Sequence, residues 1–363
     1  MKKAISIVLA VMMFAALLTG CEFLQGLGNQ LNQYVGKIQG KAVYFDKPAN
    51  QNGGIVVRLL GAGLMLPPNK IPLDVSPVFK TTGGNGSFIF DHVAPGTYLV
   101  IAEDPSGEYQ PANAVVEVGE NEKVDVGTLV LTKAVRHVLI FRDPGSEWGN
   151  DSTIGDLLVS ELGMSEGTGP NQFEYKTSSD IPTFQPSLGD LIIIAGDQPQ
   201  VFYDTYTTHK AKFDNFVSSG GTIFWVACDM GWKMGNFTSS LPGGATWRDK
   251  YENYNDIVYF EHPITKNFPA QLYGNYASHG GFDNLDSINI FNLITLVRET
   301  DGLLPTYVEY RFGSGRVLAT TAPLEFYITN GYVYYRDLFK IMLIRSLQYI
   351  MGRPVGTDVP PAL

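Results

Sequence analysis

The hydrophobic pattern of the chain changes near residue 132, and this change constrains the fold more than any other feature of the sequence. Before it, short segments such as 37–44 and 55–59 alternate apolar and polar residues with a period of two, and turn residues such as those at 84–86 separate them. About six or seven short strands of this kind are typical of an antiparallel sandwich. We therefore predict an antiparallel β-sandwich over residues 36–132.

After residue 132, continuous apolar runs alternate with helical patterns. Runs of this kind are expected for strands that are buried on both faces of a parallel sheet. They lie at residues 137–141, 191–194, 222–227, 306–312 and 316–320, and the helical patterns at 153–162, 211–219 and 334–350. Strands that alternate with crossover helices predict an α/β doubly wound sheet, here over residues 133–352, with a C-terminal tail at 353–363. The intervening stretch after residue 228 looks irregular and aromatic.

Two segments of the first region carry a family resemblance. They are GSFIF at 86–90 and VAPGTY at 93–98, and together they resemble the core motif of carboxypeptidase regulatory-like domains. The resemblance implies a transthyretin-like sandwich within a wider carbohydrate-binding-like fold group, used as a spacer or an adhesion module. Phe88, Phe90 and Tyr98 alternate as one buried face would, so we expect them in the core. Carbohydrate binding by this sandwich stays open as an alternative function.

Four segments of the second region resemble the class I glutamine amidotransferase-like superfamily, especially its trehalose-utilisation-type relatives. They are GDLIIIAG at 189–196, FDNFVSSGG at 213–221, EHPIT at 261–265 and GSGRV at 313–317. The resemblance covers about residues 136–352 and implies a flavodoxin-like sheet. It also implies a nucleophilic cysteine on a tight turn between strand and helix, with a histidine base from an H-P-E stretch after a late strand.

Cys228 follows the run at 222–227, where that nucleophile is expected, but its surroundings depart from the family pattern. Val226 and Met230 stand where glycines would form the turn, and Ala322 takes the place of the histidine next to Pro323. Without a base a thiol stays largely protonated at neutral pH. We therefore expect Cys228 to be a small buried apolar residue.

A replacement base is the remaining route to catalysis. His279 lies between Ser278 and two glycines, which favours a flexible loop, and loops carry functional residues more often than cores do. Cys228 and His279 are therefore weak catalytic candidates, and a cysteine- or carboxylate-dependent hydrolase acting on an extracellular or envelope substrate is the alternative function.

Side chains that follow the first, second and third apolar runs are candidates for ligand binding. In open α/β sheets, ligands bind outside the carboxyl ends of the strands. Trp148 and Trp232 would flank such a crevice, with Glu147, Asp197 and Asp229 inside it. Tryptophan together with carboxylates suits a glycan or peptide ligand, although the two rings would equally well plug the crevice.

The first twenty residues have the pattern of a secretory signal. Lys2 and Lys3 precede an apolar run at 4–18, which is shorter than the 20 or so residues that a spanning helix needs. LTGC at 18–21 resembles the bacterial lipobox, which implies cleavage before Cys21 and acylation of its thiol. An ordinary signal peptide with a chance cysteine is the alternative.

Acylation of Cys21 implies anchoring in the cell membrane or the outer membrane, on the exported side. Two or three acyl chains hold a protein stably on a membrane without a spanning helix. Glu22 follows the cysteine, and the family's sorting preference then implies the outer membrane where the host has two. Residues 21–35 are polar and glycine-bearing, which predicts a tether.

Composition narrows the function further. The formal net charge is −10, and removal of Lys2 and Lys3 would make the chain more acidic. This charge argues against a nucleic-acid partner, since such binding depends on Lys and Arg. No metal-binding spacing and no phosphate-binding loop is present, so we expect neither a metal nor a cofactor. The sequence predicts a membrane lipoprotein that binds a ligand or serves a structural role, rather than an enzyme.

Overall fold

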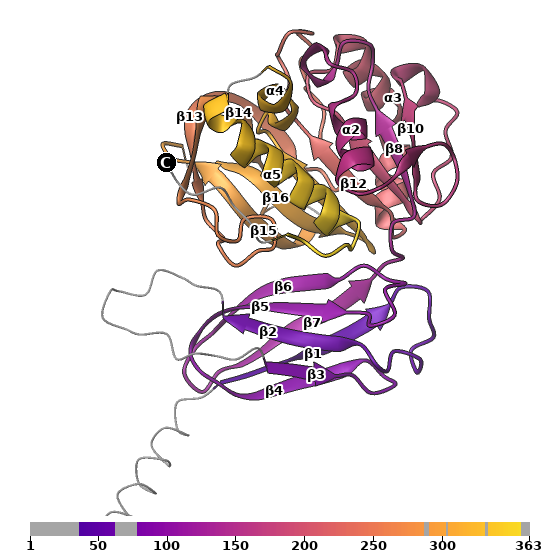
Figure 1. Ribbon diagram of the computed structural model, residues 1–363. Coiled ribbons are helices and arrows are strands. Elements are labelled where there is room, and N and C mark those ends of the chain that lie inside the picture. The colour runs from indigo at the N-terminus through magenta and orange to yellow at the C-terminus, as the bar shows by residue number, and fades with distance from the viewer. Residues whose placement is uncertain (1–35, 62–77, 287–289, 303, 331–332, 357–363) are drawn as a thin grey trace, which may run out of the picture.

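The computed structural model describes residues 36–61, 78–286, 290–302, 304–330 and 333–356. These residues form a β-rich, multidomain protein with three sheets, of three, four and ten strands. Figure 1 shows the two smaller sheets together below the larger one. The predicted signal, Cys21 and the tether at 21–35 lie outside the described residues. No helix in the described part is both long and apolar enough to cross a membrane.

The first domain is a sandwich of two sheets, ordered β4-β1-β7 and β3-β2-β5-β6. Its strands are β1 Gly36–Tyr44, β2 Val56–Gly61, β3 Val78–Thr81, β4 Ser87–Val93, β5 Gly96–Glu103, β6 Ala112–Val118 and β7 Lys123–Leu131. Phe88, Phe90 and Tyr98 are buried in its core, as the alternation predicts. The hydroxyl of Tyr98 donates to the backbone oxygen of Ala94 at 2.8 Å and fixes the turn before β5.

One pairing in the sandwich differs from the antiparallel arrangement that we predict. Strands β1 and β7 run parallel, from Lys37 opposite Lys123 to Tyr44 opposite Leu131. These strands are the first and the last of the domain. No hairpin joins them, so nothing in the local sequence imposes an antiparallel pairing.

The second domain is built on the ten-stranded sheet, ordered β14-β13-β15-β16-β17-β12-β11-β8-β10-β9. Its strands are β8 His137–Phe141, β9 Ser165–Glu166, β10 Gln172–Lys176, β11 Asp190–Ile194, β12 Thr222–Val226, β13 Thr246–Ile257, β14 Gln271–Asp283, β15 Ile290–Glu299, β16 Pro305–Phe312 and β17 Gly315–Thr320. Its helices are α2 Thr153–Ser160, α3 Gln200–Ser218, α4 Leu324–Thr329 and α5 Val333–Ile350. Strands β10, β8, β11, β12 and β17 pair in parallel, in that spatial order.

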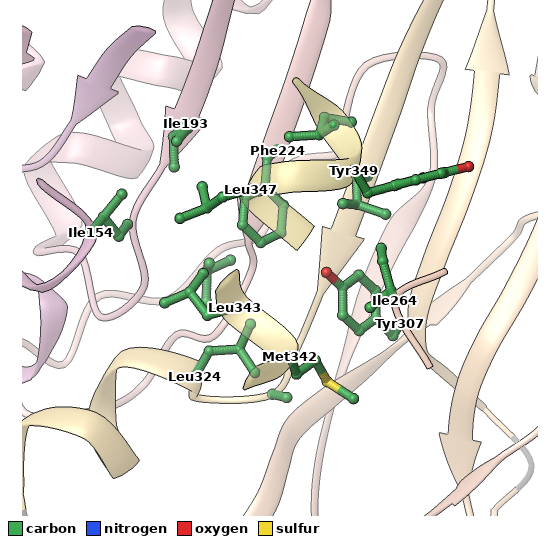
Figure 2. Packing of buried hydrophobic residues seen from close by; sticks show 14 of the residues in the cluster. Ile154, Ile193, Phe224, Ile264, Tyr307, Leu324, Met342, Leu343, Leu347 and Tyr349 are labelled. Carbon is green, nitrogen blue, oxygen red and sulfur yellow. The ribbon is translucent and has the colours of Figure 1, made fainter. Parts of the chain in front are cut away.

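Both faces of the parallel strands are covered. Alternate residues of each strand enter different cores, because successive strand side chains point to opposite faces. Ile193 and Phe224 pack in the core that includes α2 and α5, whereas Ile192 and Trp225 pack in the core that includes α3. Figure 2 shows Leu347 of α5 among the side chains of the first core.

The stretch after residue 228 is not irregular as expected. It contains β13, β14 and β15, which extend the sheet with antiparallel strands. The pairing of β13 with β14 shifts register twice, between Arg248 and Tyr251 and between Glu252 and Tyr254. Such bulges interrupt the alternation of period two, so the sequence pattern conceals these strands.

The two domains meet through buried side chains. Gln110 of the sandwich donates from Nε2 to Thr222 Oγ1 at 3.3 Å, and its Oε1 accepts from Arg316 Nη1 at 3.4 Å. Asn113 donates to the hydroxyl of Tyr349 on α5. Leu99 of β5 belongs to the same apolar core as α5. The interface therefore combines apolar packing with buried hydrogen bonds.

Candidate functional site

Four loops meet at the carboxyl edge of the parallel strands, after β8, β11, β12 and β17. Gln198, which follows β11, joins two of them. Its Oε1 accepts from the backbone of Asp143 at 3.0 Å and from Ser146 Oγ at 2.7 Å, and its Nε2 donates to the oxygen of Phe141 at 3.1 Å. All these groups are buried, so the loops have a fixed geometry.

The backbone of these loops is strained. Glu147, Trp148, Asp197 and Met230 have φ angles of 52°, 59°, 55° and 52°. Non-glycine residues seldom adopt positive φ, each instance costs on the order of 1–3 kcal/mol, and such residues cluster at functional sites. Gly231 passes so close to Trp148 that a Cβ would lie 2.6 Å from the indole ring, which explains the glycine at this position.

Cys228 lies at the end of β12 and is fully buried, in accordance with our interpretation of it as an apolar residue. Burial raises the pKa of its thiol well above the ordinary value, and the carboxyls of Glu325, Asp229 and Asp197 raise it further. A nucleophilic thiol needs the opposite surroundings, with a positive neighbour or a base.

His279 lies in strand β14 and not on the flexible loop that we expect from its neighbouring glycines. Its backbone N–H donates to the oxygen of Thr321 at 2.9 Å, and its Nδ1 lies 3.4 Å from the backbone oxygen of Asp229. Burial lowers the pKa of the imidazole to about 4. The ring is therefore neutral at physiological pH, and its hydrogen bond goes to the backbone beside Cys228 and not to the thiol.

Four buried carboxyl groups share one pattern of hydrogen bonding. We call them the crevice carboxyls: Glu147, Asp197, Asp229 and Glu325. In each, one oxygen accepts a backbone N–H. Glu147 accepts from Ile154 at 2.8 Å and Asp197 from Lys233 at 2.9 Å. Asp229 accepts from Phe237 at 2.6 Å and Glu325 from Gly196 at 3.1 Å. The other oxygen of each group is buried and has no hydrogen-bond partner.

This half-satisfied pattern raises the pKa of all four groups. Burial is the largest cause in each case. The pKa of Glu147 and of Asp229 rises to about 8, that of Glu325 to about 7 and that of Asp197 to about 6. A buried ionised carboxylate with few donors is costly. Glu147 and Asp229 therefore hold their protons at neutral pH and Glu325 holds its proton in part, whereas Asp197 is mostly ionised there.

Aromatic rings pack together at the same edge of the sheet as the crevice carboxyls, and both Trp148 and Asp197 lie against Gly231. The ring of Trp148 is buried, and its centroid lies 5.2 Å from that of His279, 5.1 Å from that of Phe326 and 6.0 Å from that of Trp232. Trp232 is 58% exposed. The structure thus brings the two predicted tryptophans together, the first buried and the second exposed.

The sequence-based prediction includes Glu147, Asp197 and Asp229 but misses Glu325, Tyr251 and Tyr276. Glu325 follows β17, so the rule that sites lie at the carboxyl ends of parallel strands is the signal that could have identified it. In the described part of the chain no group of three or more His, Cys, Asp and Glu side chains is arranged to hold a metal ion.

No family model matches the chain. An uncharacterised protein of Clostridium acetobutylicum is 29% identical over 196 residues, which are 54% of this chain and 19% of that protein. The chain thus spans about a fifth of the length of the curated relative that it matches.

Several solved structures resemble parts of the chain. An exo-β-1,4-mannosidase from an Opitutaceae bacterium is 14% identical over 59% of this chain and 36% of its own, with a TM-score of 0.36. A cytoplasmic protein from Salmonella typhimurium is 13% identical over 59% of this chain and 98% of its own, with a TM-score of 0.35. The full-length major pilin of Corynebacterium diphtheriae is 18% identical over 28% of this chain and 31% of its own, with a TM-score of 0.21. At these TM-scores the similarities carry no argument about function.

Proposed function

We propose that the chain is a lipid-anchored surface lipoprotein whose second domain is a non-catalytic relative of the class I glutamine amidotransferase-like domains and binds a ligand. The class is supported by the spatial order of the parallel strands, β10-β8-β11-β12-β17, which is 2-1-3-4-5 in order of appearance. This is the flavodoxin-like order of doubly wound sheets. The transthyretin-like character of the first domain rests on its motif and on its two packed sheets.

The observation that carries the proposal is the environment of Cys228. The thiol has no exposed surface, and three carboxyl groups oppose its ionisation. Trp148 is itself buried at this edge and packs against Trp232, His279 and Phe326. Exposed rings remain at the rim of the crevice, so the site retains a surface for binding although the chemistry of the family is missing.

The experiment compares the native chain with Cys228→Ala. Glycan and peptide arrays measure binding, and a panel of ester, amide and glycoside substrates measures turnover. We expect binding to be unchanged in the variant and no turnover in either protein. Turnover that Cys228→Ala or Glu325→Gln abolishes would instead establish the hydrolase alternative. Binding that an isolated sandwich retains in full would establish the first domain as the binding module.

The lipid anchor rests on the segment 18–21 and on the signal pattern before it. Because acylation needs the thiol, Cys21→Ser is expected to move the protein from the membrane fraction to a released exported form. Cys228→Ala serves as the matched control and is expected to stay membrane-bound. If the Cys21→Ser protein stays with the membrane, the anchor is something other than lipid.

A further inference from the structure

Three exposed aromatic rings lie at this edge of the sheet, and we call them the ring surface: Trp232, Tyr251 and Tyr276. The Tyr251 centroid lies 5.4 Å from that of Tyr276 and 5.0 Å from that of His279, and the buried rings of His279 and Trp148 connect this pair to Trp232. Trp232, Tyr276 and Tyr251 are 58%, 46% and 38% exposed. Clustered exposed rings of this size mark interaction sites more often than single exposed residues do.

The position of Tyr276 is a second, independent observation. Its φ is 59°, an outlier for a bulky residue, and it lies in β14 next to a register shift. Asn253 on the paired strand holds this conformation, because its Oδ1 accepts the backbone N–H of Tyr276 at 2.9 Å. Bulges of this kind redirect side chains near functional sites. The strained backbone here turns a ring toward the solvent and toward Tyr251.

We propose that the ring surface binds a neutral glycan, with the C–H face of a pyranose ring stacked on the exposed aromatic faces. This inference rests on the proposed binding function and names its ligand class. The faces of aromatic rings are negative, and the C–H groups of a sugar ring carry the complementary partial positive charge. Polar side chains at the rim, among them Lys233, Asn253 and Asn275, then supply hydrogen bonds for the hydroxyls.

Two observations favour this ligand over the alternatives. The formal net charge of the chain is −10, which disfavours anionic polysaccharides. A peptide would most simply add to the free edge of β14. There the hydroxyl of Tyr327 already donates to the backbone oxygen of Asn275 at 2.8 Å and lies 3.5 Å from that of Tyr276, so the edge is blocked where it passes the rings.

The test is calorimetric titration of the full chain with neutral hexaoses, both β-1,4-linked glucose and mannose and α-1,4-linked glucose. Trp232→Ala and Tyr276→Ala are each expected to weaken binding of the preferred hexaose at least tenfold, equivalent to about 1.4 kcal/mol. Phe79→Ala is the matched control, because Phe79 is 67% exposed on β3 of the sandwich and far from the ring surface in sequence and fold. It is expected to leave affinity unchanged, and unfolding midpoints confirm that each variant is folded.

Asn253 is a positioning residue, and two variants separate its effect on Tyr276 from a general structural one. Asn253→Ala removes the acceptor and is expected to weaken binding, whereas Asn253→Asp keeps a carboxylate oxygen for the same N–H and is expected to restore it. Hexaose binding that the ring variants leave intact would overturn the inference and preserve the proposed function with a site elsewhere. Binding of array peptides, but no hexaose, through Trp232 would likewise overturn the glycan assignment alone.

Discussion

Two buried polar clusters in the second domain differ in how their charges are satisfied. In the first, which we call the interface network, Glu309 accepts from Arg316 Nε at 2.6 Å, from the hydroxyl of Tyr349 at 2.9 Å and from His262 Nε2 at 3.2 Å. The N–H of Ile264 donates to His262 Nδ1, so the imidazole is the neutral tautomer that donates from Nε2. The crevice carboxyls are equally buried, yet each leaves one oxygen without a hydrogen bond, although Glu147 Oε1 lies 3.8 Å from Arg142 Nε.

This difference sets opposite protonation states in a single domain. The Arg316 guanidinium and the donors around Glu309 hold the pKa of that carboxyl well below its ordinary value despite burial. Burial with fewer donors raises the pKa of the crevice carboxyls, even at Glu147, where Arg142 acts in the opposite direction. Burial therefore does not decide the charge of a carboxyl by itself; the number of donors facing it does. We infer that the interface network stabilises the fold at neutral pH and that the crevice carboxyls do not.

The largest expected effect comes from breaking the interface network. Glu309→Gln leaves the guanidinium of Arg316 buried without its counter-charge, and removal of one partner from a buried pair costs about 3–5 kcal/mol. We expect a loss of this size in the free energy of unfolding, measured by urea denaturation at pH 7. The double variant Glu309→Gln/Arg316→Met removes both charges and is expected to lose clearly less. Equal losses in the two proteins would show that the ion pair is not the source of the effect.

The next largest effect tests whether the hydrogen bonds of Gln110 couple the unfolding of the two domains. Gln110→Ala removes the sandwich's hydrogen bonds to Thr222 and Arg316, and a buried group left without its partner costs about 1–3 kcal/mol. We expect the single urea transition to become two, since the domains lose part of their coupling. Gln39→Ala, whose amide bonds Asp125 on the exposed face of the same sandwich, is the control and is expected to change stability by less than about 0.5 kcal/mol. An unchanged transition would place the coupling in the apolar contacts alone.

The crevice carboxyls and Glu309 make the stability of the fold depend on pH in opposite directions. Because the folded-state pKa of Glu147 is about 8 and that of Glu325 about 7, the folded protein keeps protons that the unfolded chain releases above pH 4–5. Their contribution to stability is complete at acidic pH and is lost as the pH rises to 7 and 8. Glu309, with a lowered pKa, contributes at neutral pH and loses its contribution on acidification.

Glu147→Gln and Glu325→Gln should therefore flatten the decline of stability between pH 5 and 8. The expected gain over the native chain at pH 8 is at least about 1.4 kcal/mol, the equivalent of one pKa unit, measured as the free energy of unfolding across this range. Glu166→Gln on the exposed strand β9 is the control and should leave the slope as it is. Parallel curves for the native chain and both crevice variants would contradict the raised pKa values.

The smallest expected effect concerns Cys228, which lies among the crevice carboxyls. We expect iodoacetamide to leave the native protein unlabelled at pH 8 and to react only after unfolding, because the thiol is buried and protonated. Cys228→Ala should cost no more than about 1 kcal/mol, since the side chain is small. Rapid native labelling with a midpoint well below pH 8 would contradict this environment and favour the hydrolase.

The sequence-based predictions are accurate where the signal is local and fail where the structure depends on contacts between distant segments. Alternation and turn residues predict the burial of Phe88, Phe90 and Tyr98, because these signals are local. The predicted placement of His279 is wrong, since the two glycines that follow it suggest a loop, whereas pairing with β13 makes the segment a strand. That pairing is a long-range event with two register shifts, and local sequence does not encode it.

The crevice carboxyls also depend in part on a contact between segments that are far apart in the sequence. The rule for parallel strands brings Glu147, Asp197 and Asp229 to one edge of the sheet, and the structure does place them there. Whether such groups contact solvent depends on what covers them. Glu325 completes the cluster from 129 residues away by accepting the N–H of Gly196, and no pattern in either segment indicates that contact.

The free edge of the ten-stranded sheet is a possible site of aggregation when many copies of the protein lie close together. A 13-residue edge strand such as β14 offers unpaired backbone groups on which a second chain can grow into an aggregate. Here the left-handed Tyr276 bends the strand and the hydroxyl of Tyr327 occupies the exposed oxygens. If lipid crowds many copies onto one membrane, these two tyrosines protect them from edge-to-edge association.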